Sequence, residues 1–443
     1  MSCHRCGPGY ASPQEAVKGP REKVLFVTAP HAAGGNDALF SIDVDPDSET
    51  FQKPIGRVDF PHQGDEVHHT GWNSCSSCYD KPTEKRTHLI LPCLNSDRIY
   101  IVDVRNPKSL ELTTTVEPEQ LHAENVSFPH TSHCLADGNI MISTLGDRDG
   151  GNKGNFILLD GKTFKVNGTW IEAEKSVDFN YDFWDVMIST EWGAPRLIKQ
   201  GFNPEHVGDR FYGNHVHVFK WSTRVKLQSL ELPLPHGALP LEVRFLHEPT
   251  SPHAYVGCAL GSTIFHLTEG ENGEYVANPV VEIEAKKVSN WALPSMPALI
   301  TDILISMNDR FLYVSCWLHG DIRQYDISDP SKPKLTGQVF IGGSIHNGTT
   351  VKVENDDFEV PKALYVKNKT IEGGPQMLQL SLDGKRLYVT TSLYAKWDQQ
   401  FYPKLHKNGA VMLQINVLED GGGPYLAHEM RYPGGDCTSD IWI

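Results

Sequence analysis

The stretch Ser306–Cys316, which reads SMNDRFLYVSC, contains the pattern that decides the fold. A turn dipeptide comes first, and a short run of aromatic and β-branched residues that ends in a small residue follows it. This order is typical of a hairpin between two strands. Ser381–Thr391, which reads SLDGKRLYVTT, has the same order. The two stretches therefore indicate a repeated β unit.

Similar strands recur along the chain about every 60 residues, which is the spacing of a propeller blade plus a loop. There are seven of them, at Val24–Ala29, Leu89–Cys93, Ile140–Thr144, Val186–Thr190, Ala254–Cys258, Leu312–Cys316 and Leu387–Thr391. We expect an all-β fold, a seven-bladed β-propeller, that forms one domain over residues 1–443, with residues 1–22 as an N-terminal extension packed on it. The alternative is a β-sandwich or a two-domain β protein built from unrelated strands.

Helical signals are sparse outside one expected turn at Ser12–Val17, which has a serine N-cap followed by proline. We expect long loops at residues 145–155, 350–375 and 392–408, where glycine and mixed polarity interrupt the strand pattern. In a propeller such insertions gather on one face, where binding residues usually lie.

Composition narrows the functional classes. The formal net charge of −15 argues against nucleic acid and anionic membrane surfaces as partners, because both would repel the chain. The N-terminus has no apolar signal segment, and no apolar stretch is long enough to span a bilayer. Nine cysteines spread thinly over the chain suggest reduced thiols. We therefore expect a cytosolic protein without a membrane span.

Histidines are frequent, 20 in all, and several share a repeat position. His133 lies eleven residues before Thr144, and His247 lies eleven residues before Cys258, so counting places both on innermost strands that face the channel. Similar local sequences extend the set, which becomes His68, His69, His130, His133, His247 and His428. Imidazoles that converge on one axis predict a site for copper, zinc or iron, although any one of them could be a hydrogen-bonded structural histidine.

Two cysteines follow the first histidine pair. Cys75 and Cys78 form a C-x-x-C motif without the βαβ context of a thioredoxin-like protein. We expect both thiols to be reduced and close to the histidines, where they could bind a soft ligand; two ordinary half-buried thiols are the alternative.

Longer motifs carry a family resemblance. The chain resembles the selenium-binding protein family, which includes methanethiol oxidases, from about Cys6 to its last residue. The resemblance rests on His68–Cys78 (HHTGWNSCSSC), His130–Cys134 (HTSHC), Leu318–Asp326 (LHGDIRQYD), Gly373–Met377 (GGPQM) and Tyr432–Ile443 (YPGGDCTSDIWI). His68, His69, His130 and His133 lie in these stretches, and the resemblance implies that His247 and His428 fall in family motifs as well.

The resemblance implies a propeller enzyme that oxidises methanethiol with O2 and water to formaldehyde, hydrogen sulfide and hydrogen peroxide, with copper as cofactor. Glu66, Glu429 and Asp436 are then candidate catalytic proton acceptors. Gln52 stands where vertebrate relatives carry a cysteine linked to selenium binding. If selenium is a further cofactor, Cys75 or Cys78 is expected to bind it.

Two other functional classes remain open from the sequence. One is a non-catalytic selenium- or thiol-binding scaffold, and the other is a propeller hydrolase that depends on zinc or calcium. Metal content distinguishes the three classes. Copper favours the oxidase, zinc or calcium favours the hydrolase, and no metal favours the scaffold.

Overall fold

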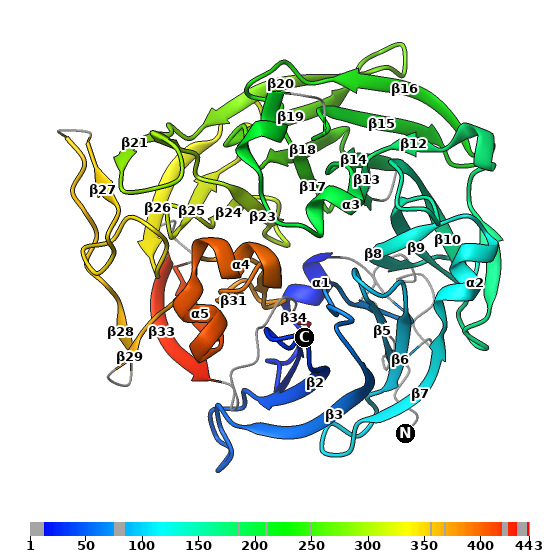
Figure 1. Cartoon of the computed structure of the whole chain (residues 1–443), viewed down its shortest axis with the longest axis horizontal. Coiled ribbons are helices and arrows are strands. Elements are labelled where there is room, and N and C mark those ends of the chain that lie inside the picture. The colour runs from blue at the N-terminus through cyan, green and yellow to red at the C-terminus, as the bar shows by residue number, and fades with distance from the viewer. Residues whose placement is uncertain are drawn as a thin grey trace.

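The computed structural model describes residues 13–74, 85–184, 187–208, 211–248, 250–354, 357–366, 369–418, 424–431 and 441–442. Of residues 424–431 and 441–442 it describes the backbone only. Antiparallel sheets are arranged in a ring around a central axis (Figure 1). Among the helices in these ranges, none combines the length and the apolar character of a membrane-spanning segment.

Within the described residues, seven of the sheets are larger than the others, each with a path of four strands running outward from the axis. The first three are β34(Ile441–Trp442)-β1(Val24–Ala29)-β2(Asn36–Asp43)-β3(Pro54–Gln63), β4(Gly71–Trp72)-β5(His88–Pro92)-β6(Ile99–Asp103)-β7(Glu111–Val116), and β8(Ser127–Cys134)-β9(Asn139–Gly146)-β10(Lys153–Asp160)-β11(Val166–Thr169), where β12(Val177–Asp178) also pairs with β10.

The remaining four sheets follow in chain order. They are β13(Asn180–Trp184)-β14(Ile188–Glu191)-β15(His215–Lys220)-β16(Val225–Glu231), β17(Pro240–Phe245)-β18(His253–Cys258)-β19(Thr263–Glu269)-β20(Tyr275–Glu282), β23(Ile300–Ile305)-β24(Phe311–Cys316)-β25(Asp321–Asp326)-β26(Lys334–Phe340), and β30(Leu378–Leu380)-β31(Arg386–Thr390)-β32(Val411–Val417)-β33(Pro424–Arg431).

Each repeat strand of the sequence lies in a different sheet, next to the innermost strand. This confirms the prediction that no two of the repeat strands share a sheet. The first and last parts of the chain meet in one sheet, because β34 pairs with β1 through Phe26–Trp442 and Val27–Ile441. The C-terminal strand thus completes the sheet that the N-terminal strands begin, and the ring closes there (Figure 1).

Burial explains why these strands pack as a ring. Middle strands such as β24 are buried along their whole length, whereas outer strands such as β16 are exposed or half-buried throughout. The core consists of apolar layers between neighbouring sheets; one layer joins Ile90 and Ile101 to Ile140 and Ile142. Strands buried on both faces read as continuous apolar runs, which is the pattern that marked the repeats.

Small elements connect the sheets. They are the strands β21(Lys286–Ser289), β22(Ser295–Met296), β27(Lys352–Val353), β28(Tyr365–Val366) and β29(Lys369–Thr370), the helices α1(Pro13–Val17), α2(Pro118–Ala123), α3(Pro195–Ile198), α4(Ala395–Phe401) and α5(Pro403–Asn408), and the 3-10 turns Ala173–Lys175 and Pro204–Gly208. The expected turn near Ser12 is confirmed as α1. The expected loop at 392–408 is wrong, because α4 and α5 occupy most of it.

Candidate metal centre

Three imidazoles meet inside the ring. His68 and His69 lie in the segment before β4, separated from it by Thr70, and His130 lies on β8, the innermost strand of the next sheet. One nitrogen from each ring can be chosen so that the three atoms lie within 4.8 Å of one another. The ring centroids of His69 and His130 are 4.1 Å apart, and His68 lies 5.2 Å from each of them. The structure therefore brings together three of the six predicted histidines.

Local backbone geometry places these side chains. The segment before β4 runs along β5, because Val67 bridges to Cys93 and the His68 amide donates to the carbonyl of Pro92 at 3.3 Å. On β8 the register shifts between Pro129 and Ser132, which is the signature of a β-bulge around His130. Bulges re-aim side chains near functional sites.

Burial sets the charge of the three rings. His68, His69 and His130 are at most 5% exposed. Burial lowers the pKa of His68 to about 4 and lowers the pKa values of His69 and His130 well below the ordinary range. Neighbouring imidazoles lower the last two pKa values further. Neutral imidazole is the form that binds a metal ion, so all three rings are prepared to act as ligands at neutral pH.

Contacts with its neighbours fix the orientation of the His130 ring. Its Nδ1 lies 3.0 Å from the Thr131 hydroxyl oxygen, while its Nε2 is buried with no hydrogen-bond partner among the described residues. The Tyr181 ring packs on it with centroids 4.0 Å apart, and Trp192 lies 6.4 Å away. A ring that is held through one nitrogen and offers the other is the usual arrangement of a metal-binding histidine.

His133 lies on the same strand but outside the group of three. Its ring is edge-on to Phe183 and Trp184, with centroids 5.0 and 4.8 Å away. Burial lowers the pKa of His133 to about 4, and a backbone hydrogen bond with Phe183 opposes this shift. His133 is thus a neutral imidazole beside the three candidate ligands.

Counting predicted that His247 lies on an inner strand, and this prediction is wrong. It follows the end of β17, and its side chain and amide both contact the Asp309 carboxylate, at 2.9 and 2.7 Å. The hydrogen bonds with His247 help to lower the pKa of Asp309, against the effect of burial. In this structure His247 joins two hairpins, and it is not part of the imidazole group.

His428 and Glu429 lie on β33, whose backbone pairs with β32 as the outermost strand of its sheet. An inner-strand position was expected for His428, and the structure differs because β34, further along the chain, supplies the inner strand where the ring closes. Cys75, Cys78 and Asp436 lie outside the described residues.

Glu66 is a buried acid two residues before His68. One oxygen of its carboxyl group accepts a hydrogen bond from the Ala395 amide at the start of α4, at 3.0 Å. Burial raises the pKa of Glu66 to about 8, and the nearby carboxylates of Asp37 and Asp398 raise it further. This contact attaches α4 to the segment that carries the imidazoles.

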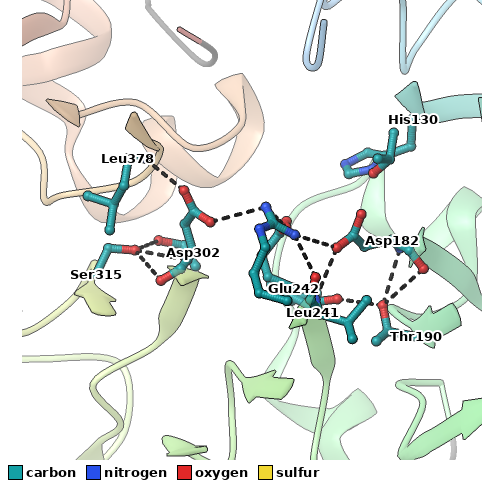
Figure 2. Close-up of polar contacts among 12 residues, drawn as sticks. His130, Asp182, Thr190, Leu241, Glu242, Asp302, Ser315 and Leu378 are labelled. Atoms are coloured by element: carbon teal, nitrogen blue, oxygen red, sulfur yellow. Dashed lines mark hydrogen bonds and ion pairs between the residues drawn. The ribbon is translucent and has the colours of Figure 1, made fainter. Parts of the chain in front are cut away.

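The sequence interpretation missed a polar network on the inner strands of three successive sheets. Figure 2 shows Asp182 of β13, Glu242 of β17 and Asp302 of β23 around one guanidinium group, that of Arg244. The nitrogen–oxygen distances are 2.8 Å to Asp182, 2.6 Å to Glu242 and 3.6 Å to Asp302. The sequence contains a signal for this network. In Glu242-Val243-Arg244-Phe245, charged residues alternate with apolar ones, in a strand that was expected to face the channel.

A ring of antiparallel sheets with buried, neutral imidazoles inside defines a β-sheet protein with a candidate transition-metal centre. The model of the 56 kDa selenium-binding protein family matches residues 4–443. The chain therefore belongs to this family.

Comparison with individual proteins leads to the same family. Methanethiol oxidase from Rattus norvegicus is 51% identical, with 100% of this chain and 99% of the relative covered. Selenium-binding protein 2 from Mus musculus is 50% identical over the same shares. Among solved structures, a hypothetical selenium-binding protein from Sulfolobus tokodaii is 34% identical, with a TM-score of 0.86 over 99% of this chain and 97% of its own.

Proposed function

We propose that this protein is a methanethiol oxidase that converts methanethiol, O2 and water to formaldehyde, hydrogen sulfide and hydrogen peroxide, with copper bound by His68, His69 and His130. The observation that carries the proposal is the buried group of three neutral imidazoles, in a chain whose relatives include proteins named methanethiol oxidase. We also infer that the seven larger sheets are the blades of a single propeller domain over residues 1–443, on which residues 1–22 pack.

The donor set fits copper. Imidazole nitrogen suits copper, zinc and iron, whereas calcium and magnesium need oxygen ligands. Copper bound here would supply redox chemistry toward O2 and would lower the pKa of a coordinated thiol. Zinc would bind the same rings but has no redox chemistry, so the identity of the bound metal separates an oxidase from a hydrolase.

The surrounding residues prepare the site for a small, weakly polar substrate. Thr131 holds the His130 ring through Nδ1, and Tyr181 and Trp192 pack against that ring. These two contacts surround the His130 ring with aromatic carbon, which would suit the methyl group of the substrate. Glu66 remains the proposed proton acceptor for the thiol, since it is the expected carboxyl group whose side chain the structure describes. Its raised pKa of about 8 means that it must lose its own proton before it can accept one.

The test is turnover by the purified, copper-reconstituted protein. Methanethiol should be consumed, with hydrogen sulfide, formaldehyde and peroxide formed in equal amounts. His130→Ala should lose both copper and turnover, while His62→Ala, on the outer strand β3, should keep both. Full copper content without product would refute the oxidase and favour a binding protein. Activity that depends on zinc instead of copper would favour a hydrolase.

A further inference from the structure

The Arg244 network is a second buried polar group on the inner strands of the sheets, near the imidazoles. The guanidinium carbon lies 5.1 Å from the centre of the Trp184 ring, and the His133 ring is 4.8 Å from that ring. Tyr181, which packs on His130, directly precedes Asp182 in the chain. Figure 2 shows His130 and the network in one view. The imidazoles and the Arg244 network are therefore connected through residues of β13.

The network has more acid than base. Three carboxyl groups, each at most 2% exposed, surround a single guanidinium group. Carboxylates packed this closely in a poorly solvated channel cannot all be ionised. Asp182 and Glu242 both bind the one guanidinium group, at 2.8 and 2.6 Å, so their carboxyl groups are held close together beside a single positive charge. The network therefore holds at least one proton on its carboxyl groups.

The contacts of the two acids show which one carries it. One Asp182 oxygen accepts hydrogen bonds from the Val243 amide at 3.0 Å and from Arg244 at 2.8 Å, so in these contacts Asp182 acts only as an acceptor. Glu242 has one oxygen on Arg244 at 2.6 Å, while its Oε1 is buried with no hydrogen-bond partner among the described residues. Burial raises the pKa of Glu242 well above the ordinary range. Glu242 is thus the acid and Asp182 the base of an adjacent pair.

We propose that Glu242 and Asp182 are the general acid and general base that break the carbon–sulfur bond of a hemithioacetal in this channel. The inference rests on the proposed function, in which water adds to a thioaldehyde-level product and gives HO–CH2–SH. Arg244 is a positioning residue, because it holds both carboxyl groups and does not transfer the proton itself.

The step balances without an oxidant. Asp182 accepts the hydroxyl proton, and the electron pair of the O–H bond forms the second carbon–oxygen bond of formaldehyde. The carbon–sulfur pair leaves with sulfur, which takes the Glu242 proton, so hydrogen sulfide is released. After the products leave, the proton passes from Asp182 back to Glu242, whose carboxyl group is held beside Asp182 by the same guanidinium group. Acid–base catalysis of this kind typically accelerates a step by about 10²–10⁴-fold.

The experiment uses the full chain without metal, because this step needs none. Formaldehyde and hydrosulfide are mixed to form the hemithioacetal, and its breakdown rate is measured by ¹³C exchange NMR. The wild type should accelerate breakdown, and Glu242→Gln or Asp182→Asn should remove at least about nine-tenths of this acceleration. Glu191→Gln is the matched control, because Glu191 is a buried acid that pairs with His215 and His217, outside the network.

A second measurement does not depend on whether the variants fold. Infrared spectra of the wild type at neutral pH, with ¹³C-labelled glutamate, should show a protonated carboxyl band that disappears in Glu242→Gln and persists in Glu191→Gln. Four other polar groups face the pair and could shift its titration, namely Tyr181, His133, Asp302 and Arg244. The pH dependence of breakdown is therefore compared with that of the infrared band: both should decline together as pH rises.

The outcomes separate this inference from the proposed function. Copper-dependent methanethiol oxidation without any acceleration by the metal-free protein would overturn the inference alone. Acceleration that Glu242→Gln and Asp182→Asn abolish, without methanethiol oxidation by the copper-loaded protein, would leave the acid–base pair standing and refute the oxidase. A wild type without a protonated glutamate band would also overturn the inference.

Discussion

Arg244 and His133 occupy the same register position in two different sheets. His133 of β8 lies opposite Met141, and Arg244 of β17 lies opposite Tyr255; each partner is three residues before the end of its repeat strand. A fixed cation and a neutral imidazole are thereby placed at one level of the channel. Burial is the main cause of the low pKa of His133, and the positive charge of Arg244 lowers that pKa further.

Removing the guanidinium group should destabilise the fold strongly. Arg244→Leu leaves three buried carboxyl groups without their cation, and breaking a buried ion pair in this way costs about 3–5 kcal/mol. Urea unfolding followed by circular dichroism measures the change. Arg57→Leu is the control, since the Arg57–Asp59 pair is exposed and should contribute less than about 1 kcal/mol. Equal effects of the two substitutions would contradict the assignment of Arg244.

Thr131→Val should weaken copper binding without unfolding the protein. The substitution keeps the side-chain volume but removes the hydroxyl group that orients His130 through Nδ1. Loss of such an orienting partner typically costs about 10–100-fold in metal affinity. Competition with a copper chelator measures the change, and Thr113→Val on the exposed strand β7 should leave the affinity unaltered. An unchanged affinity in Thr131→Val would show that the hydroxyl group has no orienting role.

His247→Ala should reduce stability and leave the copper content intact. The variant loses the side-chain hydrogen bond to Asp309, which is a charged partner, so a cost of about 1–2 kcal/mol is expected. Metal analysis and urea unfolding on the same preparation test both parts. Loss of copper at unchanged stability would restore His247 as a ligand.

The lowered pKa of Glu191 leads to a prediction of how the free energy of unfolding depends on pH. Burial alone would raise its pKa, but hydrogen bonds with His215 and His217 outweigh burial and lower the pKa to about 2. A carboxyl group whose pKa is depressed on folding stabilises the native state above its unfolded pKa of about 4.5, and this contribution is lost as pH falls toward 2. It can reach about 3 kcal/mol at neutral pH.

The measurement for Glu191 is the free energy of unfolding of the wild type and Glu191→Gln between pH 7 and pH 2. The difference between the two proteins should be constant above pH 5 and should shrink as the pH falls from about 4.5 toward 2. A difference that grows on acidification would contradict the sign of the shift.

The repeat strands and three of the site histidines could be predicted from the sequence because both depend on local pattern. Counting eleven residues back from Thr144 correctly placed His133 on an inner strand, and that strand, β8, also carries His130. His247 was misplaced because the hairpins differ in length. Residues 246–252 join β17 to β18, whereas residues 135–138 join β8 to β9. The three extra residues shift the equivalent position from His247 to Arg244.

Two other features, one local and one long-range, were missed for different reasons. The helix α4 was missed because Tyr394, its N-cap residue, makes no side-chain capping hydrogen bond, so the usual signature at a helix start is absent. The acid pair was missed because Asp182 and Glu242 lie 60 residues apart, in neighbouring sheets, and sequence similarity between blades does not show which side chains meet across the channel.

The central claim is that His68, His69 and His130 hold copper. The most direct test is anomalous diffraction at the copper edge from crystals of the copper-loaded protein. We predict one strong peak per chain, bounded by one nitrogen from each of the three rings, and its loss in His130→Ala. A protein that contains copper but shows its peak elsewhere, or no peak between these rings, would contradict the account.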